Sequence, residues 1–188
     1  MRTAGFILAG GKSSRMGQDK ALLPYRGSTL VQHIAGFVAA VAGSATVVGR
    51  PAIYVGLNLP AIPDLYPHTG PLGGIVTALS STTAIWNLVV ACDLPAIDTS
   101  FLARLVETAI DGNALCLIPR TGDGQEHPLC AVYRSEALSI LREQLLNGKR
   151  KLREAIRPLA PHWLELKDEK AVTNVNTRDE WLAYGASR

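Results

Sequence analysis

The residues best suited to chemistry lie in one stretch near the N-terminus, where a short apolar run meets glycines and cations. The apolar run over residues 4–8 is broken at Gly10 and Gly11. Glycine lets the backbone approach a bulky anion closely, and consecutive loop N–H groups can surround phosphate oxygens. Arg15 and Lys20 then supply positive charge for a polyphosphate. We interpret this stretch as a loop for a nucleoside triphosphate; the alternative is an ordinary strand-to-helix turn with solvated charges.

Other common catalytic and phosphate-binding motifs do not fit. Gly5 and Gly11 are one residue too far apart for a Walker A loop, and most of the residues between them belong to the predicted strand. The three-glycine spacing of Rossmann dinucleotide sites is also absent. No Gly-x-Ser-x-Gly sequence supports a hydrolytic triad, and His33 and His127 have no partner at metal or triad spacing.

Asp93 is the most informative residue outside this loop. It follows the apolar run 86–91, and ligands of open α/β sheets bind beyond the carboxyl ends of the strands. Mg²⁺ prefers few carboxylates together with phosphate oxygens and water. The alternative role, a helix cap, is not needed, because Asp98, Thr99 and Ser100 already precede the next helix. We therefore predict that Asp93 binds a metal ion.

Several other features leave two interpretations open. Asp64 is either a turn residue, which its spacing favours, or a contact to ribose or base. Residues 70–74 form either a tight turn or a surface for a flat base. Asn174 and Asn176 alternate in an extended segment, so they face one side, either to help a helix cap or to anchor a substrate or metal shell. The basic run 149–157 is either a solvated helix face or a clamp for a phosphate of a second substrate.

These residues need a framework, and the rest of the chain predicts alternating strands and helices. Strands are expected at 4–8, 45–48, 53–57, 86–91, 114–119, 129–133, 163–166, with a hairpin through the polar turn 121–125. Helices are expected at 30–41, 75–80, 101–109, 135–146 and after a capping box at 177–180. This alternation predicts an α/β fold with a mostly parallel sheet and helices on both faces, in one domain over residues 1–188.

Composition excludes several classes of protein. Hydrophobic residues make up 47% of the chain and charged residues 19%, as in ordinary globular proteins. The net charge of +3 is too small to indicate a nucleic-acid partner. No apolar run approaches the roughly 20 residues of a membrane span, and no signal peptide is recognisable. The widely spaced Cys92, Cys116 and Cys130 fit neither disulfides nor zinc. We expect a cytoplasmic protein with no nucleic-acid or membrane partner.

The stretch from residue 8 to residue 20, Leu-Ala-Gly-Gly-Lys-Ser-Ser-Arg-Met-Gly-Gln-Asp-Lys, resembles the signature of nucleotidyltransferases that build activated cofactors and sugars. Its Leu-Ala-Gly-Gly form, with Asp19 and Lys20, is similar in particular to the molybdenum cofactor guanylyltransferases of the MobA family. Further motifs follow in that family's order at 70–74, 92–95, 127–128 and 174–177. The resemblance covers nearly the whole chain and implies a three-layer, Rossmann-like nucleotidyltransferase fold.

The resemblance also implies an activity, the transfer of GMP from GTP to molybdopterin with release of pyrophosphate and with Mg²⁺ as cofactor. It implies catalytic roles for Arg15, Lys20 and Asp93, with Asp93 as the metal ligand. The implied nucleotide contacts are Leu8, Ala9, Gly10, Gly11, Lys20, Asp64 and Asp93. The implied residues on the pterin side are Asn174, Asn176, Arg150 and Lys151. Other molybdenum cofactor biosynthesis proteins and target molybdoenzymes would be further partners.

The chain departs from the family pattern after its second predicted strand. Where the family usually has an asparagine, this chain has Gly49 and Arg50, which leaves the base specificity open. The alternative enzyme is a molybdopterin cytidylyltransferase, whose relatives usually carry Leu-Ala-Ala-Gly and a proline before the second lysine. Gly10 and Gly11, as part of Leu-Ala-Gly-Gly, and Asp19 favour guanine.

Two more distant alternatives are weaker. A sugar-1-phosphate nucleotidyltransferase needs a longer sugar-binding region than 188 residues provide. A nucleotide-binding adaptor in molybdoenzyme maturation would not need Arg15, Lys20 and Asp93 together.

Overall fold

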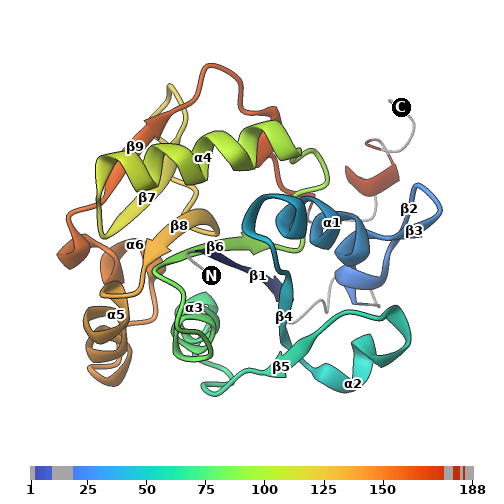
Figure 1. Ribbon diagram of the computed structural model, residues 1–188, viewed down its shortest axis with the longest axis horizontal. Coiled ribbons are helices and arrows are strands. Elements are labelled where there is room, and N and C mark those ends of the chain that lie inside the picture. Colours follow the sequence, from blue (N-terminus) through green and yellow to red (C-terminus); the bar gives the residue numbers. More distant parts are fainter. Residues whose placement is uncertain (1–2, 10–18, 176–179, 183, 185–188) are drawn as a thin grey trace.

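The protein, described by a computed structural model for residues 3–9, 19–175, 180–182 and 184, has an α/β fold built on a seven-stranded sheet (Figure 1). The strands of this sheet are β1 (Thr3–Ala9), β4 (Thr46–Gly49), β5 (Ala61–Pro63), β6 (Trp86–Ala91), β7 (Cys116–Arg120), β8 (Cys130–Arg134) and β9 (His162–Glu165). A separate two-stranded ribbon pairs β2 (Pro24–Tyr25) with β3 (Ser28–Thr29).

The helices connect these strands. The α-helices are α1 (Leu30–Ala42), α2 (Pro51–Tyr54), α3 (Pro71–Ser80), α4 (Thr99–Gly112), α5 (Ala137–Leu146) and α6 (Leu152–Ala155). Short 3₁₀ helices are η1 (Lys20–Leu22), η2 (Val55–Leu57), η3 (Arg157–Leu159) and η4 (Lys170–Val172). In the part of the chain that the structure describes, no helix is long and apolar enough to cross a membrane.

The strand order is β5-β4-β1-β6-β8-β7-β9, and its two halves differ. The strands β5, β4, β1 and β6 are all parallel to one another. On the other side, β8 is antiparallel to both β6 and β7, while β9 returns parallel to β7. The mostly parallel sheet with helices on both faces is therefore confirmed.

Two hydrophobic cores make the fold three-layered (Figure 1). Helices α1 and α4 pack together on one face of the sheet, and α3 and α5 pack together on the other. The sequence of α1 shows why: Leu30, Ile34 and Val38 recur at helical spacing and are all buried. The N-cap Thr29 and Gln32 form a capping box that starts this helix where the sequence predicts.

The predicted strand at 53–57 is wrong. That segment forms α2 and η2, because Pro51 occupies the first helical position and favours a turn of helix there. Val55 in this segment is 77% exposed, which differs from the burial expected of an apolar residue in a sheet strand. The third strand is instead β5, whose residue Ala61 pairs with Val47 of β4.

The helix predicted at 75–80 begins earlier, at Pro71, so most of the glycine cluster at 70–74 is helical. Gly73 is required there, because a Cβ atom would lie 2.1 Å from Thr69 Oγ1 and 2.8 Å from the Tyr66 carbonyl oxygen. The first turn of α3 therefore packs directly against the preceding turn. The predicted capping box at 177–180 lies largely outside the described residues.

Candidate active site

A cavity of about 600 Å³ lies beyond the carboxyl ends of β1, β4 and β6. It brings together all the predicted nucleotide-site residues that the structure describes: Leu8, Ala9, Lys20, Asp64 and Asp93. Its other lining residues are Asp19, Val48, His68, Gly70, Pro71, Gly74, Ala91, Cys92 and Leu129. This is the position in which ligands of open α/β sheets bind.

The strand register places Asp93 beside the end of β1. Leu8 pairs with Ala91 in the parallel ladder, and the Cys92 N–H donates to the Leu8 carbonyl oxygen at 3.2 Å. The chain leaves β6 immediately afterwards, so the Asp93 side chain is delivered to the cavity. The Asp93 carbonyl oxygen in turn accepts from the Val175 N–H at 3.0 Å, which ties the C-terminal segment to this edge.

Asp93 is a buried carboxylate with one cation nearby. Its Oδ2 lies 3.9 Å from Lys20 Nζ, and the two side chains are 19% and 17% exposed. Its Oδ1 is buried and has no hydrogen-bond partner among the residues that the structure describes. Burial raises the pKa of this carboxyl, and Lys20 only partly opposes that shift. An unsatisfied carboxylate oxygen beside a fixed cation fits a site for a metal ion and phosphates.

Within the described ranges, no group of three or more His, Cys, Asp or Glu side chains could hold a metal ion. This does not count against Asp93, since Mg²⁺ is usually held by one or two carboxylates together with phosphates and water. The neighbouring Cys92 is free, and burial raises the pKa of its thiol to about 12. It is therefore neutral, in keeping with a buried thiol.

At the cavity, the backbones of β1 and β4 lie close together, with no side chain on the β4 residue that faces β1. Ala9 pairs with Gly49, where a Cβ atom would lie only 2.4 Å from the Ala9 carbonyl oxygen. The same oxygen accepts from the hydroxyl of the buried Tyr54 at 3.0 Å. Gly49 thus permits this close approach of the two strands.

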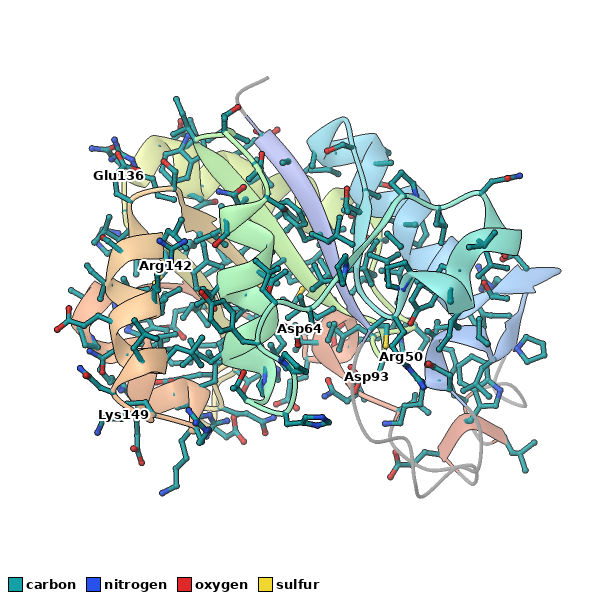
Figure 2. All side chains as sticks on the ribbon, turned by 90° about the horizontal axis from the view of Figure 1, so that it is seen from below. Arg50, Asp64, Asp93, Glu136, Arg142 and Lys149 are labelled. Atoms are coloured by element: carbon teal, nitrogen blue, oxygen red, sulfur yellow. The ribbon has the colours of Figure 1, made fainter. Side chains whose placement is uncertain are left out.

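The next residue, Arg50, turns toward the signature stretch. Its Nη2 lies 3.2 Å from Asp19 Oδ2, while Asp19 Oδ1 accepts from the Ala21 N–H at 3.1 Å and so caps η1. Figure 2 shows Arg50, Asp64 and Asp93 in one region, well away from Glu136 and Lys149. Asp19 lines the cavity and was predicted only as part of the signature.

Asp64 stabilises a turn and also lines the first cavity. Its Oδ1 accepts from the Tyr66 N–H at 2.9 Å and from Thr77 Oγ1 at 3.1 Å, which is a turn-stabilising arrangement. The side chain also lines the cavity. The turn interpretation is therefore correct as far as these bonds go, and a nucleoside contact stays a prediction.

A second cavity, of about 550 Å³, adjoins the first through Pro71, Ala91 and Leu129, which line both. Lys151 and Asn174, two of the predicted pterin-side residues, line it. Arg150 does not; its Nη1 donates to the Leu145 and Lys149 carbonyl oxygens. Sequence reasoning gave no role to Glu126, which also lines this cavity, and the only signal for it was its place beside the His-Pro motif.

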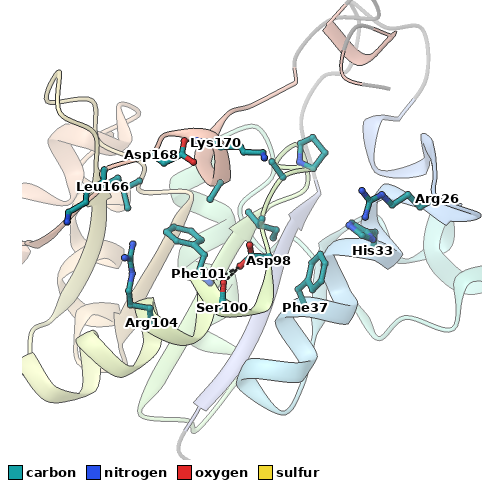
Figure 3. A pocket seen from close by; sticks show the side chains of 15 residues that line it. Arg26, His33, Phe37, Asp98, Ser100, Phe101, Arg104, Leu166, Asp168 and Lys170 are labelled. Atoms are coloured by element: carbon teal, nitrogen blue, oxygen red, sulfur yellow. Dashed lines mark hydrogen bonds between the residues drawn. The ribbon is translucent and has the colours of Figure 1, made fainter. Parts of the chain in front are cut away.

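A third cavity, of about 610 Å³, lies between α1, α4 and η4 and contains none of the predicted site residues (Figure 3). Its carboxylates are already engaged. Asp98 Oδ1 accepts from Ser100 Oγ and from the Phe101 N–H as the cap of α4, and Asp168 accepts from the Lys170 N–H. Its size alone therefore does not make it the site of chemistry.

Four predicted site residues, Gly10, Gly11, Arg15 and Asn176, lie outside the described residues, and their roles stay predictions.

Comparison with known proteins supports a single family. Residues 5–165 match the family described as "MobA-like NTP transferase domain". A "probable molybdenum cofactor guanylyltransferase" of Chloroflexus aggregans is 32% identical, over 96% of this chain and 92% of that protein. A protein of the same description from Nostoc is also 32% identical, over 93% and 86% of the two chains.

The solved structures agree on the fold. Molybdopterin-guanine dinucleotide biosynthesis protein A from Archaeoglobus fulgidus superposes with a TM-score of 0.83 at 22% identity, covering 98% of this chain and 100% of that one. Together with the match over residues 5–165, these likenesses show that the chain belongs to the family of MobA-like NTP transferase domains.

Proposed function

We propose that this chain is a molybdenum cofactor guanylyltransferase, which transfers GMP from GTP to molybdopterin and releases pyrophosphate. An oxygen of the molybdopterin phosphate forms a bond to the α-phosphorus of GTP. The bond from that phosphorus to the oxygen bridging to the β-phosphate breaks, and pyrophosphate leaves with the electron pair. Chemistry of this kind depends mainly on positioning and charge neutralisation.

The observation that carries the proposal is the pairing of Lys20 with Asp93 at 3.9 Å inside the cavity. Lys20 would neutralise charge on the phosphates of GTP. Because it is largely buried, its interaction with phosphate is less screened by water than that of a surface lysine. The ends of β1 and β4, at Ala9 and Gly49, would bring backbone groups close to the nucleotide.

Membership of this family implies a divalent metal, and the donors of this chain fit one. Asp93 has an unpartnered carboxylate oxygen, and phosphate oxygens would complete the ligand set. We propose Mg²⁺ as this ion, with Asp93 as its protein ligand. When bound, it would neutralise charge that develops on the phosphate oxygens.

The adjoining cavity would hold the acceptor. Lys151 and Asn174 line it, and its shared wall at Ala91 and Leu129 would place the acceptor phosphate next to the nucleotide. The hydrogen bond from Val175 to Asp93 links the segment of Asn174 directly to the metal ligand. This arrangement supports a reaction between two substrates held in neighbouring cavities.

The proposal extends to the setting of the enzyme. The three cysteines are all free, which supports the reducing cytoplasm as its location. We also propose that residues 1–188 act as a single nucleotidyltransferase domain. Other cofactor biosynthesis proteins and molybdoenzymes would be its partners.

The test is pyrophosphate release by the purified chain supplied with molybdopterin, Mg²⁺ and each of the four nucleoside triphosphates in turn. We expect release with GTP, and none when molybdopterin is omitted. Thermal unfolding with each nucleotide gives an independent readout, since a ligand at 100 times its dissociation constant stabilises by about 2.7 kcal/mol. A preference for CTP would make the chain a cytidylyltransferase. If none of the four nucleotides gives pyrophosphate release and none raises the thermal midpoint, the proposal is contradicted.

A further inference from the structure

Two polar side chains in the second cavity have buried atoms without partners. Glu126 is only 9% exposed, and within the described part of the chain its Oε2 has no hydrogen-bond partner. Nε2 of the adjacent His127 is likewise buried and unpartnered. Both residues line the cavity in which Lys151 and Asn174 lie. Buried polar atoms are nearly always paired in native proteins, so two neighbouring exceptions at one cavity indicate a missing ligand.

The rest of this segment is fully engaged, which shows that the two free atoms do not result from a loose loop. Arg157 Nη2 bonds Glu126 Oε1 at 3.0 Å, and Arg153 donates to the Glu126 carbonyl oxygen at 3.3 Å. The His127 N–H donates to the Pro119 carbonyl oxygen at 3.0 Å, and its own carbonyl oxygen accepts from Cys130. The segment is therefore held in place with one acceptor of Glu126 and one nitrogen of His127 still available.

The charge state of each group limits the ligand. The Glu126 carboxylate pairs with Arg157, and a carboxylate oxygen such as Oε2 can only accept hydrogen bonds, so its ligand must supply a donor. Burial, aided by the positive charge of Arg153, lowers the pKa of His127. A neutral imidazole can donate or accept at Nε2 according to its tautomer. The pair therefore suits a ligand edge with a donor and, next to it, either a donor or an acceptor.

The cavity around this pair also has an apolar surface, formed by Pro71, Leu94, Pro128 and Leu152 beside its polar and charged residues. Apolar surface combined with placed polar groups is typical of small-molecule sites. The 2-amino-4-oxopyrimidine edge of a pterin carries an amino group and a ring N–H as donors, beside a carbonyl acceptor.

We propose that Glu126 and His127 recognise the 2-amino-4-oxopyrimidine edge of the acceptor's pterin ring, with Glu126 Oε2 accepting from the ring's donors. This inference rests on the proposed function for the identity of the acceptor. It adds two specificity-determining residues that act on the ring, whereas Lys151 and Asn174 would act elsewhere on the acceptor. Guanine carries a similar edge, so the test separates the two rings.

The first test uses the unaltered chain with two free rings as probes, 6-hydroxymethylpterin and its 6-hydroxymethyllumazine analogue, in which an oxygen replaces the 2-amino group. Binding is followed by the fluorescence of the ring, with a saturating non-hydrolysable GTP analogue present to occupy the nucleotide cavity. We expect the pterin to bind about 10- to 100-fold more tightly, because lumazine places an acceptor against Glu126 Oε2. Equal affinities, or no binding of the pterin, would overturn the inference.

The second test uses Glu126→Gln, with the matched control Glu143→Gln on the exposed surface of α5. Glu126→Gln should reduce the preference for pterin over lumazine to less than threefold, while Glu143→Gln should keep it. In the transfer assay, Glu126→Gln should raise the KM for molybdopterin about tenfold and leave the KM for GTP unchanged. A merely structural role would move both constants, and the thermal midpoint of each variant reports folding.

The two proposals fail separately. A chain that distinguishes pterin from lumazine through Glu126 but transfers no GMP would contradict only the proposed function. A chain that transfers GMP to molybdopterin while Glu126→Gln behaves as Glu143→Gln does would contradict only this inference. Guanosine is the competitor that separates the two rings. If it displaces the pterin while the GTP analogue is bound, the second cavity is a purine site, and this inference is overturned.

Discussion

The two adjoining cavities are built by different halves of the sheet. The first cavity, which we propose for the nucleotide, lies at the ends of the parallel strands β1, β4 and β6, where the backbones at Ala9 and Gly49 come close together. The second cavity lies beside the antiparallel strand β8. Glu126 and His127, which precede this strand in the chain, line the cavity with side chains that have buried polar atoms. The first half thus offers closely spaced backbone together with the charged side chains of Asp19, Lys20, Asp64 and Asp93, and the second offers buried polar side chains with unpartnered atoms.

This difference suggests a division of labour. A triphosphate is common to all nucleotides, and it can be bound by main-chain groups and a few charges at the edge of a parallel sheet. A particular acceptor has to be told apart by the pattern of its donors and acceptors, which requires side chains. Changes in the first half should therefore affect turnover and nucleotide affinity, whereas changes in the second should affect the choice of acceptor.

Asp93→Asn should produce the largest effect. It removes the proposed metal ligand with almost no change in shape, so pyrophosphate release should fall about 1000-fold, as losses of charge stabilisation of several kcal/mol do. The matched control is Asp111→Asn on the exposed surface of α4, which should keep its activity. Asp93→Asn retaining more than about a tenth of the activity would remove the metal assignment.

The same variant should not destabilise the fold without ligand. Burial raises the pKa of Asp93 in the folded state, so its ionised form opposes folding as the pH rises above the unfolded pKa. Asp93→Asn should therefore raise the thermal midpoint at neutral pH and lose that advantage at pH values below about 4, where the carboxyl is protonated in both states. A lower midpoint at neutral pH would show that the carboxylate stabilises the empty protein.

Gly49→Ala should have the next largest effect. A Cβ atom 2.4 Å from the Ala9 carbonyl oxygen forces β1 and β4 apart, at a cost of about 1–3 kcal/mol in the free energy of unfolding. Nucleotide affinity should fall as well, since Ala9 lines the cavity.

Gly36→Ala on α1 is the matched control for Gly49→Ala, because a Cβ atom there meets nothing within 4 Å. It should stabilise the protein by up to about 1 kcal/mol through helix propensity. Chemical denaturation of both variants measures this difference. Two variants of equal stability would show that the strands can part at no cost.

His127→Asn should have the smallest effect, visible in the pH dependence of stability. The folded state lowers the pKa of His127, so stability is fully present above the unfolded pKa of about 6.5 and declines as the pH falls below it. The thermal midpoint of the unaltered chain should fall between about pH 7.5 and pH 5, and this fall should be smaller in His127→Asn. An equal fall in both would show that His127 is solvated.

Much of the nucleotide half could be predicted from the sequence, because its signals are local. The apolar run at 86–91 and the caps Thr29 and Asp98 fix elements through neighbouring residues, and the structure confirms them. Asp93 was placed correctly in the cavity because the residues after a parallel strand reach its carboxyl edge. The motif resemblance contributed the identity of the nucleotide and the acceptor, which no local pattern carries.

The remaining features depend on contacts between distant residues. The strand predicted at 53–57 missed the helical turn that begins at Pro51, and the bond from Tyr54 to the Ala9 carbonyl oxygen is invisible in the sequence. Glu126 received no role from the sequence, because its partner Arg157 lies 31 residues along the chain and leaves no local pattern. The resemblance implied both Arg150 and Lys151 on the pterin side, although only Lys151 lines the second cavity.

The most direct test of two substrates in two neighbouring cavities is a crossed measurement of KM for GTP and for molybdopterin in Lys20→Ala and Lys151→Ala. Lys20→Ala should raise the KM for GTP about tenfold and leave that for molybdopterin within about twofold, and Lys151→Ala should do the reverse. Both variants raising both constants alike would contradict the separation of the two sites.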